Sequence, residues 1–255
     1  LGQNYSPDDL EYFQEQTEIN VQPNVRDFGG NNKSICVSNP DSCDEANLDV
    51  QWMSAVSQQT PQSFLYMNNS EDSDWMVGFV SIFLNANFSA NNIYMDTTKY
   101  PVLGPRAPWV ISVSYGGPEQ FQATSAMDLF DVAARFLGLM GTTMMVSSGD
   151  DGSMPSFARP GGNYGSEMCN NYFPSYPASS PYVTAVGATQ GPENKYNPYG
   201  EVVCSSRSGA LITSSGGFSY HYTAKDWQVP AIDNYFNALN SSSQHNRRNL
   251  PRPGY

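Results

Sequence analysis

Strand-like and helix-like segments alternate along this chain, and the alternation limits the folds that it can adopt. Short apolar runs predict strands at residues 64–67, 109–114, 143–146 and 182–188. Stretches with the apolar period of a helix lie between these strands, at 74–84 and 124–140. This order predicts an α/β fold, a doubly wound and mainly parallel sheet with helices on both faces.

Local signals predict further helices near both ends of the chain. Ser6 offers a capping hydroxyl, Pro7 suits the first helical position, and acids follow in the first turn. A second helix is expected from about Asp44, and a last one over 229–239. The stretch 147–217 is rich in Gly, Pro, Ser and Tyr, so most of it should be loop, where binding sites tend to form.

The composition excludes several classes of protein. The 255 residues carry a formal net charge of −12, whereas a nucleic-acid binder needs a basic surface. Hydrophobic residues make up 39% of the chain, too many for a disordered protein, and no apolar run reaches the ~18 residues of a membrane span. The first residues do not form a signal peptide, so we expect that one was removed or that the chain starts part-way through its gene product. One large domain of a secreted or vesicular protein is the simplest interpretation.

Cysteines and glycosylation sequons indicate an oxidising compartment. The cysteines lack the close spacing of metal ligands, so disulfides are their expected use. Cys36 and Cys43 form a natural short-loop pair, which leaves Cys169 to pair with Cys204. An Asn- and Ser-rich chain contains some sequons by chance, but Asn-x-Ser/Thr occurs here at Asn4, Asn32, Asn68, Asn87 and Asn240, which we predict to be N-glycosylated.

The sequence offers few residues for histidine-based catalysis. The two histidines, His221 and His245, both lie in polar, loop-like surroundings. The sequence has no nucleophile elbow, zinc-protease helix, phosphate-binding loop or dinucleotide-binding loop, and no metal-ligand motif. Hydrolytic chemistry, if this chain takes part in it, must therefore rest on carboxylates.

One predicted helix presents two carboxylates on a single face. Glu45 and Asp49 are four residues apart and continue into an apolar stripe of Trp52, Met53 and Val56. Desolvation and mutual repulsion at such a place would raise the pKa of at least one acid, which suits a general acid or base at low pH. The alternative is that both acids occupy a solvated helix start, where the helix dipole favours them.

Two turns that follow predicted strands are the other candidates. Asp150 lies in a turn of small residues at the carboxyl end of a strand, where open α/β sheets place their ligands. Its carboxyl, when protonated, could donate a hydrogen bond to an oxyanion; the alternatives are a plain acidic turn or half of a calcium loop. The segment from Ser114 to Gly116 either pairs with a peptide strand or only terminates its own strand.

Taken together and in this order, these segments resemble the sedolisins, or serine-carboxyl peptidases, a family with lysosomal and secreted fungal members. The resemblance rests on a Glu-x-x-x-Asp helix from Glu45 to Asp49, a substrate strand from Val113 to Gly116 and an oxyanion turn from Ser148 to Asp150. Two further stretches, 173–189 and 215–219, also resemble family segments. The similarity extends over essentially the whole chain.

The resemblance implies a subtilisin-like fold and a role for each candidate residue. Glu45 would be the general base, Asp49 would orient it and share its proton, and Asp150 would supply the carboxylic acid of the oxyanion hole. The peptide substrate would pair with Ser114, Tyr115 and Gly116. A carboxylate base and a protonated oxyanion donor both require acid, which implies a secreted, lysosomal or vacuolar protein.

The resemblance also implies that part of the peptidase domain lies outside this chain. Family members continue past the position of Tyr255 to a Gly-Thr-Ser segment with the nucleophilic serine and to a calcium site, and they have a pro-domain before the position of Leu1. Residues 1–255 would thus be the N-terminal part, about two-thirds, of an incomplete domain. A continuation or a second polypeptide would supply the serine. One local departure is Asp151, where the family usually has Ser, and it adds negative charge beside Asp150.

Two functions are compatible with this interpretation. The first is an acid-acting serine peptidase, an endopeptidase or a tripeptidyl peptidase, that hydrolyses peptide or protein substrates. The second is a catalytically inactive relative, a secreted glycoprotein with a role in binding or assembly. The joint retention of Glu45, Asp49 and Asp150 favours the first.

Overall fold

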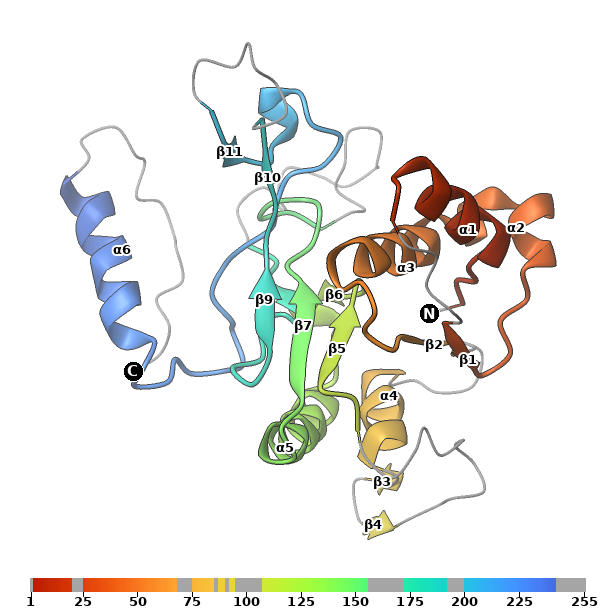
Figure 1. Ribbon diagram of the computed structural model, residues 1–255. Helices are drawn as coiled ribbons and strands as arrows, with labels where there is room; N and C mark the ends of the chain where they lie inside the picture. The colour runs from red at the N-terminus through yellow and green to blue at the C-terminus, as the bar shows by residue number, and fades with distance from the viewer. Residues whose placement is uncertain are drawn as a thin grey trace. The chain divides into compact units, whose positions relative to one another are not determined.

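Parallel strands and helices make up both parts of the structure, a computed structural model that divides into the units Leu1–Ala107 and Pro108–Tyr255 (Figure 1). The structure describes residues 2–19, 25–67, 75–84, 87–89, 92–94, 107–155, 172–191 and 200–241. For 87–89, 92–94 and 239–241 the description is of the backbone alone. The α/β class expected from the alternating segments is confirmed.

The first unit combines helices with small strand pairs. Its elements are α1 (Pro7–Gln16), β1 (Arg26–Phe28), α2 (Ser34–Ser38), the 3-10 helix η1 (Pro40–Ser42), α3 (Asp44–Val56), β2 (Ser63–Leu65), α4 (Trp75–Leu84), β3 (Asn87–Ser89) and β4 (Asn92–Tyr94). β1 pairs with β2 in parallel, and β3 pairs with β4 in antiparallel. The helices expected from Pro7, from Asp44 and over 74–84 are present, and the strand expected at 64–67 is β2, slightly earlier.

A hydrophobic core cluster of the first unit forms between α1, α3 and β2. Its buried members are Tyr5, Leu10, Ala46 and Val50, against which the partly buried Val25 and Phe64 pack. Ser6 caps α1 as expected, since its hydroxyl accepts a hydrogen bond from the Asp9 N–H at 3.1 Å. These contacts fix the face that α3 turns towards the core.

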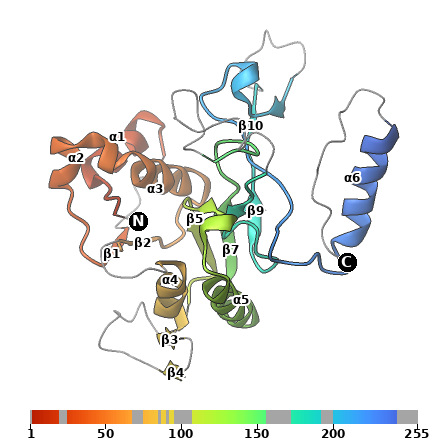
Figure 2. The same ribbon diagram turned by 180° about the vertical axis from the view of Figure 1, so that it is seen from behind.

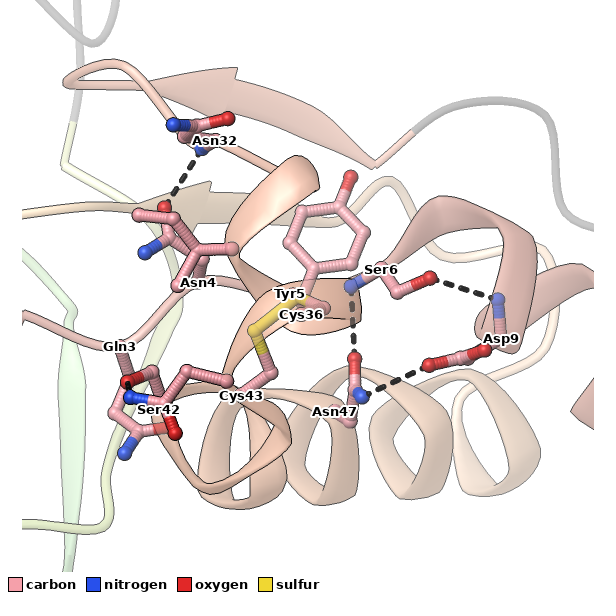
Figure 3. Close-up of a disulfide and its surroundings, with 12 residues drawn as sticks. Gln3, Asn4, Tyr5, Ser6, Asp9, Asn32, Cys36, Ser42, Cys43 and Asn47 are labelled. Atoms are coloured by element: carbon pink, nitrogen blue, oxygen red, sulfur yellow. Dashed lines mark hydrogen bonds between the residues drawn. A yellow bond between two sulfur atoms is a disulfide. The ribbon is translucent and has the colours of Figure 1, made fainter.

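The start of α3 is held by a disulfide and by an asparagine (Figure 3). Cys36 is bonded to Cys43, the residue just before the helix, as their short spacing predicts. In the first turn of α3, the Asn47 Oδ1 accepts a hydrogen bond from the Ser6 N–H at 2.8 Å, and its Nδ2 donates to Asp9 at 3.2 Å. The N-terminal end of α3 is therefore tied covalently to α2 and by hydrogen bonds to α1.

The burial of Asn4 is incompatible with one predicted glycosylation site. Asn4 is 1% exposed, and its Oδ1 accepts a hydrogen bond from the Asn32 N–H at 2.6 Å. A glycan on this side chain does not fit such packing, so the structure argues against glycosylation of Asn4. Asn32 is exposed and stays a prediction. Asn68 and the side chains of Asn87 and Asn240 lie outside the described residues.

The second unit is built on a parallel sheet with the strand order β5-β7-β9. Its elements are β5 (Val110–Val113), β6 (Gly117–Pro118), the 3-10 helix η2 (Glu119–Phe121), α5 (Thr124–Leu139), β7 (Thr143–Ser147), β8 (Ser175–Tyr176), β9 (Thr184–Val186), β10 (Thr189–Gln190), β11 (Val202–Val203), the 3-10 helix η5 (Ser206–Ser208) and α6 (Val229–Ser241). β6 with β8 and β10 with β11 form short antiparallel pairs. The strands and helices predicted for this half of the chain are thus present, with ends shifted by a few residues.

Register and burial show how the sheet packs. In the parallel pairs, Val110 lies opposite Thr143, and Met145 lies opposite Thr184. Both β5 and β7 alternate between buried and more exposed residues. α5 packs against β7 with a buried stripe at helical spacing, Met127, Phe130, Ala133, Ala134 and Leu137. Figure 2 shows the three strands and α5 from behind. Because β5 and β7 run parallel, their carboxyl ends lie at the same edge of the sheet.

One predicted disulfide falls partly outside the described chain. Cys204 is a buried thiol whose Sγ lies 3.8 Å from the Ile212 carbonyl oxygen. Its expected partner, Cys169, lies outside the described residues. The pairing of Cys169 with Cys204 therefore stays a prediction.

Candidate functional site

A pocket in the second unit brings together two of the segments singled out from the sequence. Its volume is about 250 Å³. It is lined by residues 114–118 after β5, by Ser147 and 149–151 at the end of β7, and by Phe173, Ser175 and Ser215 from later segments. The pocket thus lies at the carboxyl ends of neighbouring parallel strands, which is where α/β sheets form their ligand sites.

The wall after β5 depends on a close backbone approach at Gly116. Gly117 is paired with Tyr176, so the chain here runs against β8. A Cβ atom at Gly116 would lie 2.7 Å from the Tyr176 carbonyl oxygen and 2.8 Å from the Ser175 Oγ, which is closer than side chains approach. Glycine is therefore required for the backbone of Ser114 to Gly116 to pass along β8 while it lines the pocket.

The turn that carries Asp150 is held by main-chain hydrogen bonds from residues far along the chain. The Thr213 N–H donates to the Asp150 carbonyl oxygen at 2.7 Å, and the Ser215 N–H donates to the Gly149 carbonyl oxygen at 3.0 Å. The Ser215 hydroxyl oxygen also accepts from the Asp151 N–H at 3.2 Å. Gly149 has a φ of +104°, a backbone conformation that favours glycine. These contacts fix the backbone from which the exposed Asp150 side chain projects at the pocket.

The pocket is acidic. Asp150 and Asp151 both line it, and no Lys, Arg or His is found among its described lining residues. Carboxyl groups at a pocket edge can accept hydrogen bonds when ionised and donate one when protonated. A protonated carboxyl group at this place could thus donate a hydrogen bond to a bound carbonyl.

Glu45 and Asp49 lie one turn apart on α3 of the first unit, and both are half-buried. The apolar stripe of Trp52 and Val56 into which they continue is exposed to solvent, because Trp52 is 57% exposed and Val56 is 84% exposed. The buried face of α3 is one position further round the helix and is made of small residues, Ala46, Val50 and Ser54. Small side chains let α3 pack closely on its core, which leaves the acids and the larger apolar residues towards its outer face.

The structure thus gathers some predicted residues and not others. Ser114, Tyr115, Gly116 and Asp150 line one pocket, whereas Glu45 and Asp49 belong to the other unit. His221 is in a loop as expected, with its Nε2 2.8 Å from the Asp128 Oδ1, and it does not line the pocket. His245 lies outside the described residues.

Several pocket residues were not predicted individually from the sequence. Phe173, Ser175 and Ser215 fall within the two further family-like stretches, which was the available signal. Met154 and Pro155 also line the pocket but carry no sequence pattern that identifies them. Loop residues of this kind are recognised only when the fold has brought them together.

A separate polar cluster lies between α5 and the loops around it. Burial raises the pKa of Asp131, while hydrogen bonds from Ser180 and Tyr222 act in the opposite direction. Burial also raises the pKa of the Tyr222 hydroxyl, which donates to the Met127 carbonyl oxygen at 3.1 Å. The cluster anchors loops to α5, and none of these residues lines the pocket.

Neither a metal site nor a membrane span is found in the described part of the chain. No group of three or more His, Cys, Asp or Glu residues is placed there to hold a metal ion. Likewise, no helix among the described residues has the length and apolar character needed to cross a membrane.

Sequence comparison finds relatives over most of this chain, although no family model matches it. Physarolisin of Physarum polycephalum is 29% identical over 266 residues, covering 92% of this chain and 40% of that protein. Tripeptidyl-peptidase SED2 of Arthroderma otae is 30% identical over 203 residues, covering 78% of this chain and 30% of that protein. Tripeptidyl-peptidase 1 of Dictyostelium discoideum is 27% identical, covering 95% of this chain and 33% of that protein. The chain therefore spans less than half the length of these relatives.

Structural comparison points in the same direction. The structure of Pseudomonas sedolisin, a serine-carboxyl proteinase complexed with two molecules of pseudo-iodotyrostatin, superposes with a TM-score of 0.56 at 22% identity. The match covers 97% of this chain and 61% of that one. The likeness confirms the expected fold class over nearly all of the chain.

Proposed function

This chain belongs to the sedolisin family of serine-carboxyl peptidases, and we propose that it carries the carboxyl groups of an acid-acting peptidase. The observation that carries the proposal is the pocket that joins Ser114, Tyr115 and Gly116 to Asp150. An extended segment beside a potential oxyanion donor is what a peptidase needs to bind a peptide and polarise one of its carbonyl groups.

In this proposal Glu45 is the general base. It takes the proton of a serine hydroxyl as the serine oxygen attacks the peptide carbonyl carbon, and it then delivers that proton to the leaving amine. Asp49, one turn further along α3, orients Glu45 and shares its proton. The half-buried positions of both side chains support this role, because partial desolvation strengthens a hydrogen bond between two acids that share one proton.

Asp150 acts as the oxyanion donor in the same proposal. Its protonated carboxyl donates a hydrogen bond to the negative oxygen that forms when the serine attacks. The hydrogen bonds from Thr213 and Ser215 to the Asp150 turn hold this donor in place before the reaction, so little reorganisation is needed when charge develops. Ser114, Tyr115 and Gly116 hold the substrate strand beside it.

The proposal also extends to surroundings and partners. A carboxylate base and a protonated donor favour an acidic environment, so we assign the protein to a secreted or a lysosomal or vacuolar location. We assign the nucleophilic serine, and the calcium site that the family implies, to polypeptide that follows or accompanies Tyr255. The substrate is then a peptide or protein that the complete enzyme cleaves, as an endopeptidase or as a tripeptidyl peptidase.

Variants of Asp150 test the proposal in the complete protein with a peptide substrate at about pH 4. Asp150→Ala should lower kcat by about 10²–10³-fold, because one oxyanion donor is lost. Asp150→Asn keeps a donor that does not titrate, so it should retain more activity and extend activity to higher pH. Asp226→Asn changes an exposed acid of the same unit and should leave the pH profile as it is.

Two outcomes would count against the proposal. Wild-type turnover in Asp150→Ala would remove the oxyanion role. Peptide binding without hydrolysis by the wild-type protein would instead support the inactive, binding relative.

A further inference from the structure

Among the described residues, Glu119 stands out as a charged side chain that is only 3% exposed. Its Oε1 accepts hydrogen bonds from the Tyr220 N–H at 2.7 Å and from the His221 N–H at 3.0 Å. Its Oε2 accepts from the Ser219 hydroxyl at 2.7 Å. One carboxylate therefore satisfies three donors on a segment about a hundred residues further along the chain.

Ser219 couples this contact to the shape of the segment. The Ser219 Oγ accepts from the His221 N–H at 3.0 Å and from the Tyr222 N–H at 2.7 Å while its hydroxyl hydrogen points to Glu119. The segment 219–222 is thus folded round the carboxylate of Glu119. Hydrogen bonds to an ionised acceptor are stronger than neutral ones, so loss of this carboxyl group would weaken the fold of the segment.

Glu119 also adjoins the wall of the pocket along the chain. It directly follows Gly117 and Pro118, which line the pocket, and its own N–H donates to the Pro174 carbonyl oxygen at 2.9 Å. Phe173, next to Pro174, is a further lining residue. The backbone of Glu119 is therefore fixed to one side of the pocket, while its side chain reaches the segment 219–221.

The segment that is hydrogen-bonded to Glu119 leads back to the pocket within a few residues. Ser215 lines the pocket and is hydrogen-bonded to the Asp150 turn. Gly216 and Gly217 connect Ser215 to the residues that are hydrogen-bonded to Glu119. They have no side chains that could make contacts, and a Cβ at Gly216 would meet no atom within 4 Å. The stretch between Ser215 and Ser219 is thus anchored at its two ends, by the Asp150 turn and by Glu119.

We infer that Glu119 is a positioning residue for the pocket: its buried carboxylate sets where the segment from Ser215 to Gly217 lies relative to the wall formed by residues 114–118. The inference rests on the proposed function only in taking a peptide as the ligand of the pocket. Glu119 itself touches neither the substrate nor the reacting atoms. It acts through the Ser215 segment, so its loss should widen or loosen the pocket and weaken peptide binding.

Hydrogen exchange tests the positioning role without reference to activity. In the complete protein, Glu119→Ala should speed exchange of the Tyr220 and His221 amides by roughly tenfold or more, and exchange of the Ser215 amide should rise with them. Glu119→Gln keeps an oxygen that can accept from both amides, so most of the protection should return. Asp226→Ala is the control, since it removes an exposed carboxyl group of the same unit that is not among the lining residues of the pocket, and it should leave the Ser215 amide protected.

Peptide hydrolysis then tests the consequence for binding. Glu119→Ala should raise KM by about tenfold and lower kcat less than Asp150→Ala does, because the donor itself is kept while one wall and the Ser215 support of the Asp150 turn are loosened. Glu119→Gln should restore KM most of the way, and Asp226→Ala should leave KM at the wild-type value. A Ser215 amide that stays protected in Glu119→Ala, or a KM that stays at the wild-type value after that protection is lost, would overturn the inference. An inactive wild-type protein would refute the proposed function alone, because exchange at Ser215 still decides the positioning role.

Discussion

The two units of the molecule position their functional groups in different ways. In the first unit, Glu45 and Asp49 are placed by the repeat of a single helix, α3, whose start is held by a disulfide. In the second unit, the Asp150 turn and the wall at Gly116 come together through hydrogen bonds and close approaches between distant segments. A helix carries its geometry in local sequence, whereas a pocket of loops depends on contacts throughout the fold. The first arrangement should be sensitive to changes in side chains and the second to changes in backbone shape.

The largest effect is expected at Glu45, where only a side chain is changed. Glu45→Gln should lower kcat of the complete protein by about 10²–10⁴-fold while the fold stays intact, since loss of a general base removes proton transfer. Asp44→Asn alters the exposed neighbour in the same helical turn and should have little effect. Steady-state kinetics and circular dichroism provide the measurements. Equal losses in the two variants would show that the helix start matters only through its charge.

Removal of the disulfide tests whether the two units depend on each other. Replacement of both Cys36 and Cys43 by Ser should lower the free energy of unfolding of the first unit by about 2 kcal/mol, because the unfolded chain gains freedom when its short loop opens. Hydrogen exchange resolved along the sequence should show faster exchange in α2 and α3. Protection of the Thr213 and Ser215 amides should stay as in the wild type, and a matching loss there would contradict independent stabilisation of the units.

A pair of neighbouring glycines probes the backbone of the pocket. Gly116→Ala should destabilise the second unit by about 1–3 kcal/mol and weaken peptide binding, because the new methyl group would overlap the Tyr176 carbonyl oxygen. At Gly117 a Cβ would meet its nearest atom, the Gln122 Nε2, at 3.6 Å, which is an ordinary contact. Gly117→Ala should therefore be tolerated. Thermal unfolding and inhibitor titration of both variants measure the difference, and similar behaviour of the two would argue against the close approach at Gly116.

The smallest effect concerns the pH dependence of the second unit. Burial raises the pKa of Asp131 above its ordinary value of 3.8, so the folded protein holds this proton more tightly than the unfolded chain does. The stability that Asp131 contributes is complete below pH 3.8 and is lost as the pH rises through the raised pKa. Asn resembles the protonated acid, so Asp131→Asn should gain stability relative to the wild type as the pH rises. Denaturant unfolding at several pH values measures this trend, which the exposed Asp226→Asn should lack, and a trend in the opposite direction would refute it.

The contrast between the units also explains what the sequence could predict. Alternating apolar runs and helix signals are local, so the helices from Pro7 and Asp44 and the parallel strands β5, β7 and β9 could be anticipated. Resemblance to a known family identified the segments that meet at the pocket. The buried face of α3 was not predicted, because the choice of Ala46, Val50 and Ser54 over larger apolar residues depends on what packs against the helix.

Other features of the site depend on contacts between distant parts of the chain. The burial of Asn4 follows from its hydrogen bond with Asn32, which the sequon does not indicate. The role of Glu119 follows from contacts with residues 219–221, and its sequence neighbours Gly117 and Pro118 do not indicate these contacts. Such pairings arise only when the whole unit has folded, because no local propensity brings the partners together.

The link between Asp150 and Thr213 has a consequence for how this protein can change during evolution. The Thr213 N–H and carbonyl oxygen make the contacts with Asp150 and Gly152, so these contacts require no particular side chain at position 213, whose hydroxyl is hydrogen-bonded to Ser206 instead. Mutations there can accumulate without moving the carboxyl group, with proline as the exception because it lacks the N–H. Related proteins could thus drift far apart in sequence around this turn and still inherit the same placement of one acidic group.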